Sequence, residues 1–285
     1  MIKLISSLVS ILLFYSACKQ HEKPAGMPGY NLDKPEIIKM PTVLNEISGI
    51  AFNKGNPDTL YAEQDEEGRL FYFPLSTLEV KHQKFAKKGD YEDIAICNGT
   101  VIMLRSNGTL FSFPLDTNVG KDISNVQETS GVLPAGEYES MFADEASNLL
   151  YILCKNCGED EAAKSISGYI LQISAGQQLT LKGNFKLNTK EIAARLGQKK
   201  ITFRPSAIAK NFTGSEWYIL SSVNKLLVVT DTNWAIKAAY ALDPALFEQP
   251  EGIAFDSNNS LYISNERGNT AAATVLKFTF AKDKN

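Results

Sequence analysis

The sequence predicts an all-β protein, a β-propeller of four-stranded blades, and three observations carry this prediction. A phrase of the form acid, small residue, aliphatic residue, alanine, apolar residue recurs along the chain. Each copy is followed by a turn and an apolar, aromatic-rich segment that is typical of a β-strand. The spacing of the copies is near 45 residues, the length of one blade of four short strands.

Five copies define the repeat, and each is expected to form the first strand of a blade. Their anchor residues are Glu46, Glu92, Glu139, Ser206 and Glu251. Successive separations are 46, 47, 67 and 45 residues, so the count predicts five blades. Because the long third interval has room for a degenerate blade, six blades remain the alternative.

Third strands are predicted from residues that alternate between apolar and polar with a period of two. Residues 69–73 and 109–113 show this pattern, and 168–173 and 225–229 continue the series. The dipeptide Asn107-Gly108 supplies turn chemistry between two such strands.

One short helix is expected over residues 189–197, at the rim between the third and fourth units. Asn188 is the predicted N-cap and Glu191 the residue that reaches back to it. Apolar residues from Ile192 onward share one helical face, and Gly197 is suited to the C-terminal end.

The last unit is one strand short, because residues 261–264 and 273–280 leave room for only three strands after Glu251. Residues 35–40, ahead of the first repeat, have the pattern of a strand. We expect this strand to complete the last blade, since the ring then closes and leaves no exposed edge.

The N-terminus predicts export. Lys3 precedes an apolar run over residues 4–14 that is long enough for a signal peptide and too short to span a bilayer. Ser16-Ala17-Cys18 resembles the lipobox of bacterial lipoproteins, so we expect cleavage before Cys18 and acylation of that cysteine, palmitate included. The alternative is an ordinary signal peptide with Cys18 incidental.

Three segments follow: a signal peptide (1–17), a Pro- and Gly-rich flexible tether (18–34) and a propeller domain (35–285). The expected location is the bacterial cell envelope. We expect the lipid on Cys18 to insert into the outer membrane, with the domain on its periplasmic or surface face. The net charge of −3 argues against nucleic acid as a partner.

Three phrases carry a family resemblance: Glu-Ile-Ser-Gly-Ile-Ala at 46–51, Gly-Asp-Tyr-Glu-Asp-Ile-Ala at 89–95, and Gln-Pro-Glu-Gly-Ile-Ala-Phe-Asp at 249–256. In this ordered series the chain resembles the SdiA-regulated (YjiK-like) β-propeller family. The resemblance implies a propeller in the cell envelope and no particular reaction. More distant relatives of that family include calcium-dependent lactonases and an esterase-like phytase group.

The repeated carboxylates are the candidate site. First strands line the channel of a propeller, so Glu46, Glu92, Glu139 and Glu251 are predicted to converge at one mouth, with Asp93 beside them. Converging carboxylates suit a hard cation such as Ca²⁺, and without one they raise each other's pKa. The alternative is that each accepts hydrogen bonds from backbone amides of the next blade as a structural device.

Ser206 takes the place of the acid in the fourth unit, and Arg204 brings a cation just before it. Arg204 is expected either to neutralise the carboxylate ring or grip an anionic ligand, or to lie on the surface. Cys154-Lys-Asn-Cys157 lacks the partners of a zinc site and is expected to form a turn, whose thiols can bridge in an oxidising envelope. The sequence leaves open whether the two cysteines are bridged or free.

Two functional hypotheses follow. The first is a non-catalytic envelope module that offers its channel mouth or rim to a small-molecule ligand or a partner protein. It rests on the repeated site and on the lack of a nucleophile unit, since the histidines are confined to His21 and His82. The alternative is a divalent-metal-dependent hydrolase of the lactonase or phosphoesterase type, with the four glutamates placing the metal.

Overall fold

A computed structural model describes residues 26–116, 122–158, 160–161 and 164–281. The signal peptide, Cys18 and the first part of the tether lie outside these residues. Within them, no helix has the length and apolar character needed to cross a membrane.

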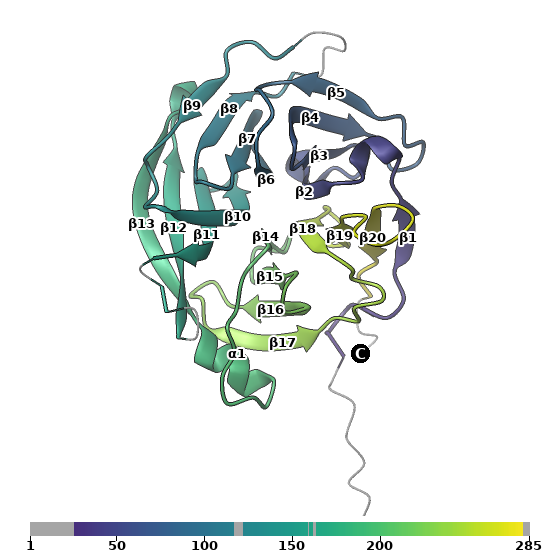
Figure 1. The fold of residues 1–285 in the computed structure, drawn as a ribbon, viewed down its shortest axis with the longest axis vertical. Coiled ribbons are helices and arrows are strands. Elements are labelled where there is room, and N and C mark those ends of the chain that lie inside the picture. The colour runs from purple at the N-terminus through teal and green to yellow at the C-terminus, as the bar shows by residue number, and fades with distance from the viewer. Residues whose placement is uncertain (1–25, 117–121, 159, 162–163, 282–285) are drawn as a thin grey trace, which may run out of the picture.

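The described chain forms five four-stranded antiparallel sheets arranged as blades around a central axis (Figure 1). Blade 1 comprises β2 (Ile47–Phe52), β3 (Leu60–Gln64), β4 (Glu67–Phe73) and β5 (Lys81–Lys84). Blade 2 comprises β6 (Tyr91–Cys97), β7 (Thr100–Arg105), β8 (Leu110–Pro114) and β9 (Gln127–Thr129). Blade 3 comprises β10 (Gly136–Asp144), β11 (Leu149–Cys157), β12 (Ser165–Ile173) and β13 (Leu179–Asn188). Blade 4 comprises β14 (Ala207–Lys210), β15 (Trp217–Ser221), β16 (Leu226–Thr230) and β17 (Ile236–Ala241).

Blade 5 joins the two ends of the chain, as predicted. Its strands are β18 (Pro250–Phe255), β19 (Leu261–Asn265), β20 (Thr274–Phe278) and β1 (Glu36–Lys39). β1 pairs antiparallel with β20, with Ile38 opposite Val275. The first strand of the domain therefore supplies the outer strand of the last blade and closes the ring.

The core is divided among the five junctions between neighbouring blades, and one apolar cluster fills each junction. Successive side chains of an inner strand point to opposite faces of its sheet. Ile253 therefore packs toward blade 4 and Ala254 toward blade 1. The aromatic residues at matching places in the second strands, such as Tyr262 and Trp217, are buried in these junctions. Their role is packing between blades.

The long third interval contains no sixth blade in the described chain. It is filled by the long strands β12 and β13 and by α1 (Thr189–Arg195). The Asn188 side chain accepts a hydrogen bond from the Lys190 backbone N–H, 3.1 Å away, and donates one to Glu191. Ile192 is fully buried in the junction between blades 3 and 4. The predicted capped helix over that rim is confirmed.

The segment assigned to the tether differs from expectation at its C-terminal end. Met27 and Tyr30 are buried between blades 4 and 5. The Tyr30 hydroxyl donates a hydrogen bond to the Asn259 carbonyl oxygen, 2.6 Å away. Gly29 has a φ of +78°, and a Cβ there would lie 2.3 Å from the Phe280 ring. Glycine at this position thus forms the turn and admits the aromatic ring.

Candidate functional site

The innermost strands are β2, β6, β10, β14 and β18, and each contacts its neighbours around the axis (Figure 1). They run in the same direction, so their N-terminal ends meet at one mouth of the channel and their C-terminal ends at the other. The two mouths differ in chemistry. We call the first the acidic mouth, and it is formed by Glu46, Asp65, Glu92, Glu139, Glu251 and Glu266.

Three predicted site residues, Glu92, Glu139 and Glu251, occupy the same place in their blades. Each sits where the pairing register between the first and second strands shifts by a β-bulge. A bulge turns a side chain out of the regular alternation. The repeated acid is therefore a repeated bulge residue.

Ser206 and Ser48 hold this place in the other two blades. Ser206 Oγ donates a hydrogen bond to the Pro250 carbonyl oxygen (2.8 Å) and accepts one from the Ser222 backbone N–H (3.1 Å). Ser48 Oγ donates to the Glu92 carbonyl oxygen (2.9 Å). Both serines thus link their blade to the next, and Ser206 is a structural residue.

Glu46 is not the equivalent of the other three glutamates, because blade 1 has its bulge at Ser48-Gly49. It groups instead with Asp65 and Glu266, and one carboxylate oxygen of each lies within 4.8 Å of the others. Asp65 and Glu266 follow the second strands of blades 1 and 5 directly. In an antiparallel pair, the end of the second strand lies beside the start of the first strand. Acids directly after a second strand are therefore a signal for this mouth, but the prediction from the sequence did not use it and missed both residues.

Four carboxyl groups of the acidic mouth, those of Asp65, Glu92, Glu251 and Glu266, have a raised pKa. Burial, and then the neighbouring Asp90, raise the pKa of Glu92 to about 8. Burial and the charge of Glu251 raise the pKa of Glu266 to about 8, and burial with Glu46 raises the pKa of Asp65 to about 6. The pKa of Glu251 is also raised by burial. Neighbouring carboxylates raise each other's pKa, as predicted, but burial raises these pKa values more.

Lys155 is a cation of this mouth that the sequence had not indicated, and Lys225 also lowers the pKa of Glu251. Lys155 Nζ pairs with Glu139 and lies 3.6 Å from Glu137 Oε1. Its charge also lowers the pKa of Glu92 and Glu251. Arg204, the predicted cation, is exposed and forms no ion pair with any described carboxylate, so its surface alternative is the one observed.

Lys155 owes its position to the Cys154-Lys-Asn-Cys157 segment. Cys154 and Cys157 form a disulfide, the question that the sequence left open. The expectation of a turn was wrong, because both cysteines belong to the strand β11. In the pairing with β10, Asn156 faces Glu137 and Cys154 faces Tyr138, so Lys155 is left over as a bulge residue. The disulfide brackets this bulge and limits the directions in which Lys155 can point.

Asp93 and Glu63 have a structural role, the alternative raised for the carboxylates. Asp93 Oδ2 accepts a hydrogen bond from the Met141 backbone N–H of blade 3 (2.6 Å), and its Oδ1 accepts one from Ile94 (2.8 Å). Glu63 Oε1 accepts from the Gly49 N–H (2.7 Å). Burial raises the pKa of both carboxyl groups well above the usual range. These acids tie backbones together below the mouth.

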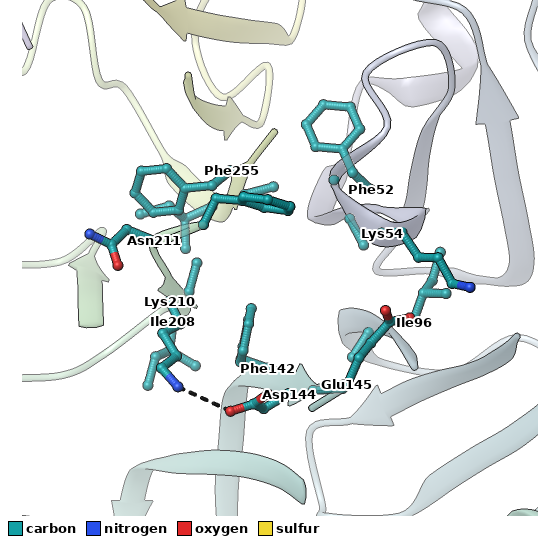
Figure 2. Close-up of a pocket in the computed structure, with 18 of the residues that line it drawn as sticks. Phe52, Lys54, Ile96, Phe142, Asp144, Glu145, Ile208, Lys210, Asn211 and Phe255 are labelled. Carbon is teal, nitrogen blue, oxygen red and sulfur yellow. Dashed lines mark hydrogen bonds and ion pairs between the residues drawn. The ribbon is translucent and has the colours of Figure 1, made fainter. Parts of the chain in front are cut away.

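The opposite end of the channel opens into a cavity of about 410 Å³, which we call the apolar cavity (Figure 2). The Ile-Ala pairs of the repeat line it, with Met141-Phe142 in their place in blade 3. The residues at equivalent positions of the five inner strands are Ile50, Ile94, Met141, Ile208 and Ile253. Nearer the opening lie Phe52, Phe142 and Phe255.

The charged side chains around the apolar cavity already have partners or face away from it. Lys210 Nζ lies 3.0 Å from Asp144 Oδ2, and both side chains are mostly buried, at 19% and 17% exposure. Glu145 accepts a hydrogen bond from the Asn98 backbone N–H, 2.9 Å away. Lys54 is exposed, and its amino group points away from the cavity in Figure 2. The cavity therefore presents apolar walls and no net charge.

Comparison with solved structures supports the fold. The chain superimposes on a luciferin-regenerating enzyme with a TM-score of 0.54 at 10% identity, covering 86% of this chain and 95% of that one. It also matches regucalcin, a calcium-binding protein from Agrobacterium tumefaciens, with a TM-score of 0.49 at 14% identity, covering 89% and 95%. Virginiamycin B lyase from Staphylococcus aureus matches with a TM-score of 0.46 at 14% identity, covering 85% and 69%.

Only the first match has a TM-score above 0.5, and at 10% identity it bears on the fold and not on the activity. No protein-family profile matches the sequence, and no curated protein matches it. A shared fold does not determine a function, which depends on the residues of the channel.

Proposed function

We propose that this chain is a lipid-anchored cell-envelope β-propeller of the SdiA-regulated (YjiK-like) type that binds a small molecule in its central channel. The anchor is the acylated Cys18, and the outer membrane is the proposed location, with the domain on its periplasmic or surface face. The lipobox-like Ser16-Ala17-Cys18 and the ordered repeat phrases support these two parts of the proposal.

The apolar cavity is the observation that carries the binding function. Ligand pockets are typically clefts of about 300–1,000 Å³ with mostly apolar walls and a few convergent polar groups. The cavity has this size and lining, and the Lys210–Asp144 pair supplies polar groups at its edge. Among the described residues, the lining of the cavity contains no pair of a nucleophile and a general base. Ligand binding is therefore better supported than catalysis.

Native mass spectrometry of the protein purified from the membranes of its own cells tests this function. We expect one small molecule per chain, released on unfolding. Ala51 lines the cavity and is half-buried, so Ala51→Leu should reduce the liganded fraction severalfold by occupying volume. Ala235→Leu, at an exposed position outside the cavity, is the control. Equal ligand content in both variants, or none in the unaltered protein, would contradict the proposal.

The second candidate is a divalent-metal-dependent hydrolase, and one observation favours it. The oxygens of Glu46, Asp65 and Glu266 converge within 4.8 Å, which suits a hard cation such as Ca²⁺. This set replaces the predicted one of four glutamates, because Glu139 is paired with Lys155 and Glu92 and Glu251 face the same lysine. Such an ion would lower the pKa of a bound water and so activate it.

Thermal unfolding in EDTA and then in Ca²⁺, Mg²⁺ or Zn²⁺ separates the two candidates. An ion that binds only the folded state stabilises it by about 2.7 kcal/mol at a hundred times its dissociation constant. We expect Ca²⁺ to raise the Tm if the carboxylate trio binds it, and Glu266→Gln to abolish the rise. The absence of a rise with every ion would eliminate the hydrolase.

A further inference from the structure

The channel was expected to act through its acidic mouth, but the opposite end has the shape and lining of a ligand site. Its chemistry narrows the ligand to one class. This inference rests on the proposed function and deepens it by naming what the apolar cavity accepts.

The walls exclude a charged ligand. Burying an ionised group without a partner costs several kcal/mol, and the ion pair nearest the cavity, Lys210–Asp144, is already complete. Asp144 Oδ1 also accepts a hydrogen bond from the Ala146 backbone N–H (3.0 Å). A charged ligand would have to break this arrangement, or draw the exposed Lys54 inward from the direction in which it points, to gain a counter-ion. A neutral ligand can leave it intact and add one hydrogen bond to it.

The opening favours a ring-shaped ligand. Phe52, Phe142 and Phe255 of blades 1, 3 and 5 line the cavity near the opening, but the rings of Phe52 and Phe255 are packed in the blade junctions, against Tyr262 and Tyr218. The aromatic ring available to a ligand there is that of Phe212, which also lines the cavity and is 52% exposed. Aromatic faces and edges add about 0.5–1.5 kcal/mol per ring pair beyond the burial of area. Isoleucines and Met141 form the deeper wall, where an apolar body gains contact area.

Phe212 presents an exposed aromatic ring at the opening. It lies on the β14–β15 loop of blade 4, lines the cavity, and is 52% exposed. Its ring rests on Gly55 of blade 1, where a Cβ would come within 2.5 Å of Phe212 Cε2. The Phe212 N–H donates to Asn259 Oδ1 at 3.0 Å, which fixes the loop against blade 5. An exposed phenylalanine held from three blades is a contact surface for whatever enters.

We propose that the apolar cavity binds an uncharged ring compound, aromatic or alicyclic, whose body lies among the isoleucines and whose outer edge contacts Phe212. A polar atom of the ligand, where it has one, faces the Lys210–Asp144 pair. The acidic mouth takes no part in this binding.

Two naphthalene dyes that share a ring system and differ in charge test the ligand class. We expect neutral N-phenyl-1-naphthylamine to bind the full chain carrying Cys18→Ser at least tenfold more tightly than anionic 8-anilino-1-naphthalenesulfonate, with fluorescence as the readout. Tighter or equal binding of the anionic dye would overturn the ligand class and leave the proposed function standing. Failure of both dyes to bind would count against the proposed function as well.

The location is tested with side chains whose loss does not disturb the core. Phe212→Ala should weaken binding of the neutral dye about fivefold, the equivalent of about 1 kcal/mol. Val223→Ala is the matched control, since Val223 is 64% exposed and lies outside the cavity. Unchanged affinity in Phe212→Ala, or an equal loss in Val223→Ala, would show that the dye binds elsewhere.

Discussion

Deletion of residues 30–41 should abolish the cooperative folding of the domain. The deletion removes β1, which is the only partner of the outer edge of β20 in the described chain, and leaves blade 5 with three strands. It also removes Tyr30 and Met40, which are 6% and 4% exposed in the core. Loss of large buried side chains costs about 3 kcal/mol or more each, against a total stability of about 5–15 kcal/mol.

Circular dichroism during heating is the measurement, and deletion of residues 19–24 is the matched control. The control shortens the chain ahead of Met27 and should leave the Tm unchanged within about 1 °C, whereas the longer deletion should give no cooperative transition. Exposed β20 should also make the longer deletion aggregate, because an open strand edge is a template for pairing. A soluble truncation with a cooperative transition would show that the closure is dispensable.

The fold was largely predictable because it is repeated. The blades repeat one phrase, so the inner strands could be located from the Ile-Ala pairs, or from Met141-Phe142 in blade 3, and from the turns that follow them. The closure by residues 35–40 followed from a strand count and the cost of open edges, and it is confirmed. The tether boundary was harder, since Pro and Gly around Met27 resemble a linker and only the ring of Phe280 over Gly29 explains the turn.

The site was predictable only in part, because a register shift is invisible in a sequence phrase. Glu46 stands four residues before Ile50, whereas Glu92 and Glu251 stand two residues before their isoleucines. The strand pairing shows that Ser48, and not Glu46, occupies the bulge position of those glutamates. Lys155 was missed because it lies between the two cysteines of Cys154-Lys-Asn-Cys157, a segment that was interpreted only for its thiols. The apolar cavity was missed for a different reason: Ile208 and Ala209 in a strand indicate core packing, and a channel wall has the same composition as a core.

The acidic mouth makes the stability of the protein depend on pH in an unusual direction. The pKa values of Glu92 and Glu266 are about 8 in the folded protein, against an ordinary value near 4.3 in the unfolded chain. Between about pH 4 and pH 8 the folded state therefore holds more protons than the unfolded state, and stability falls as the pH rises. Because both side chains are partly open to water, we expect a loss of about 2–3 kcal/mol from pH 5 to pH 9.

Lys155→Met should steepen this pH dependence. At pH 8 the substitution leaves Glu139, whose side chain is 9% exposed, without its cation. It also removes a positive charge that lowers the pKa of Glu92 and Glu251 and so stabilises their ionised forms. Breaking a buried pair costs about 3–5 kcal/mol, and the partial exposure of Lys155 (20%) reduces the expected loss to about 2–3 kcal/mol. The Tm should fall by roughly 5–10 °C at pH 8. At pH 5 the loss should be smaller, because Glu92 is then neutral.

Thermal melts of Lys155→Met and of Lys164→Met at pH 5 and pH 8 decide the matter. Lys164 pairs with Glu161 at the surface, where both side chains are more than half exposed, so its loss should change the Tm by no more than about 1 °C at either pH. The loss of stability in Lys155→Met must depend on pH if this lysine balances the carboxylates of the channel. The same decrease in Tm at both pH values would mean that Lys155 acts through packing of its aliphatic stem, and the electrostatic account of the acidic mouth would fail.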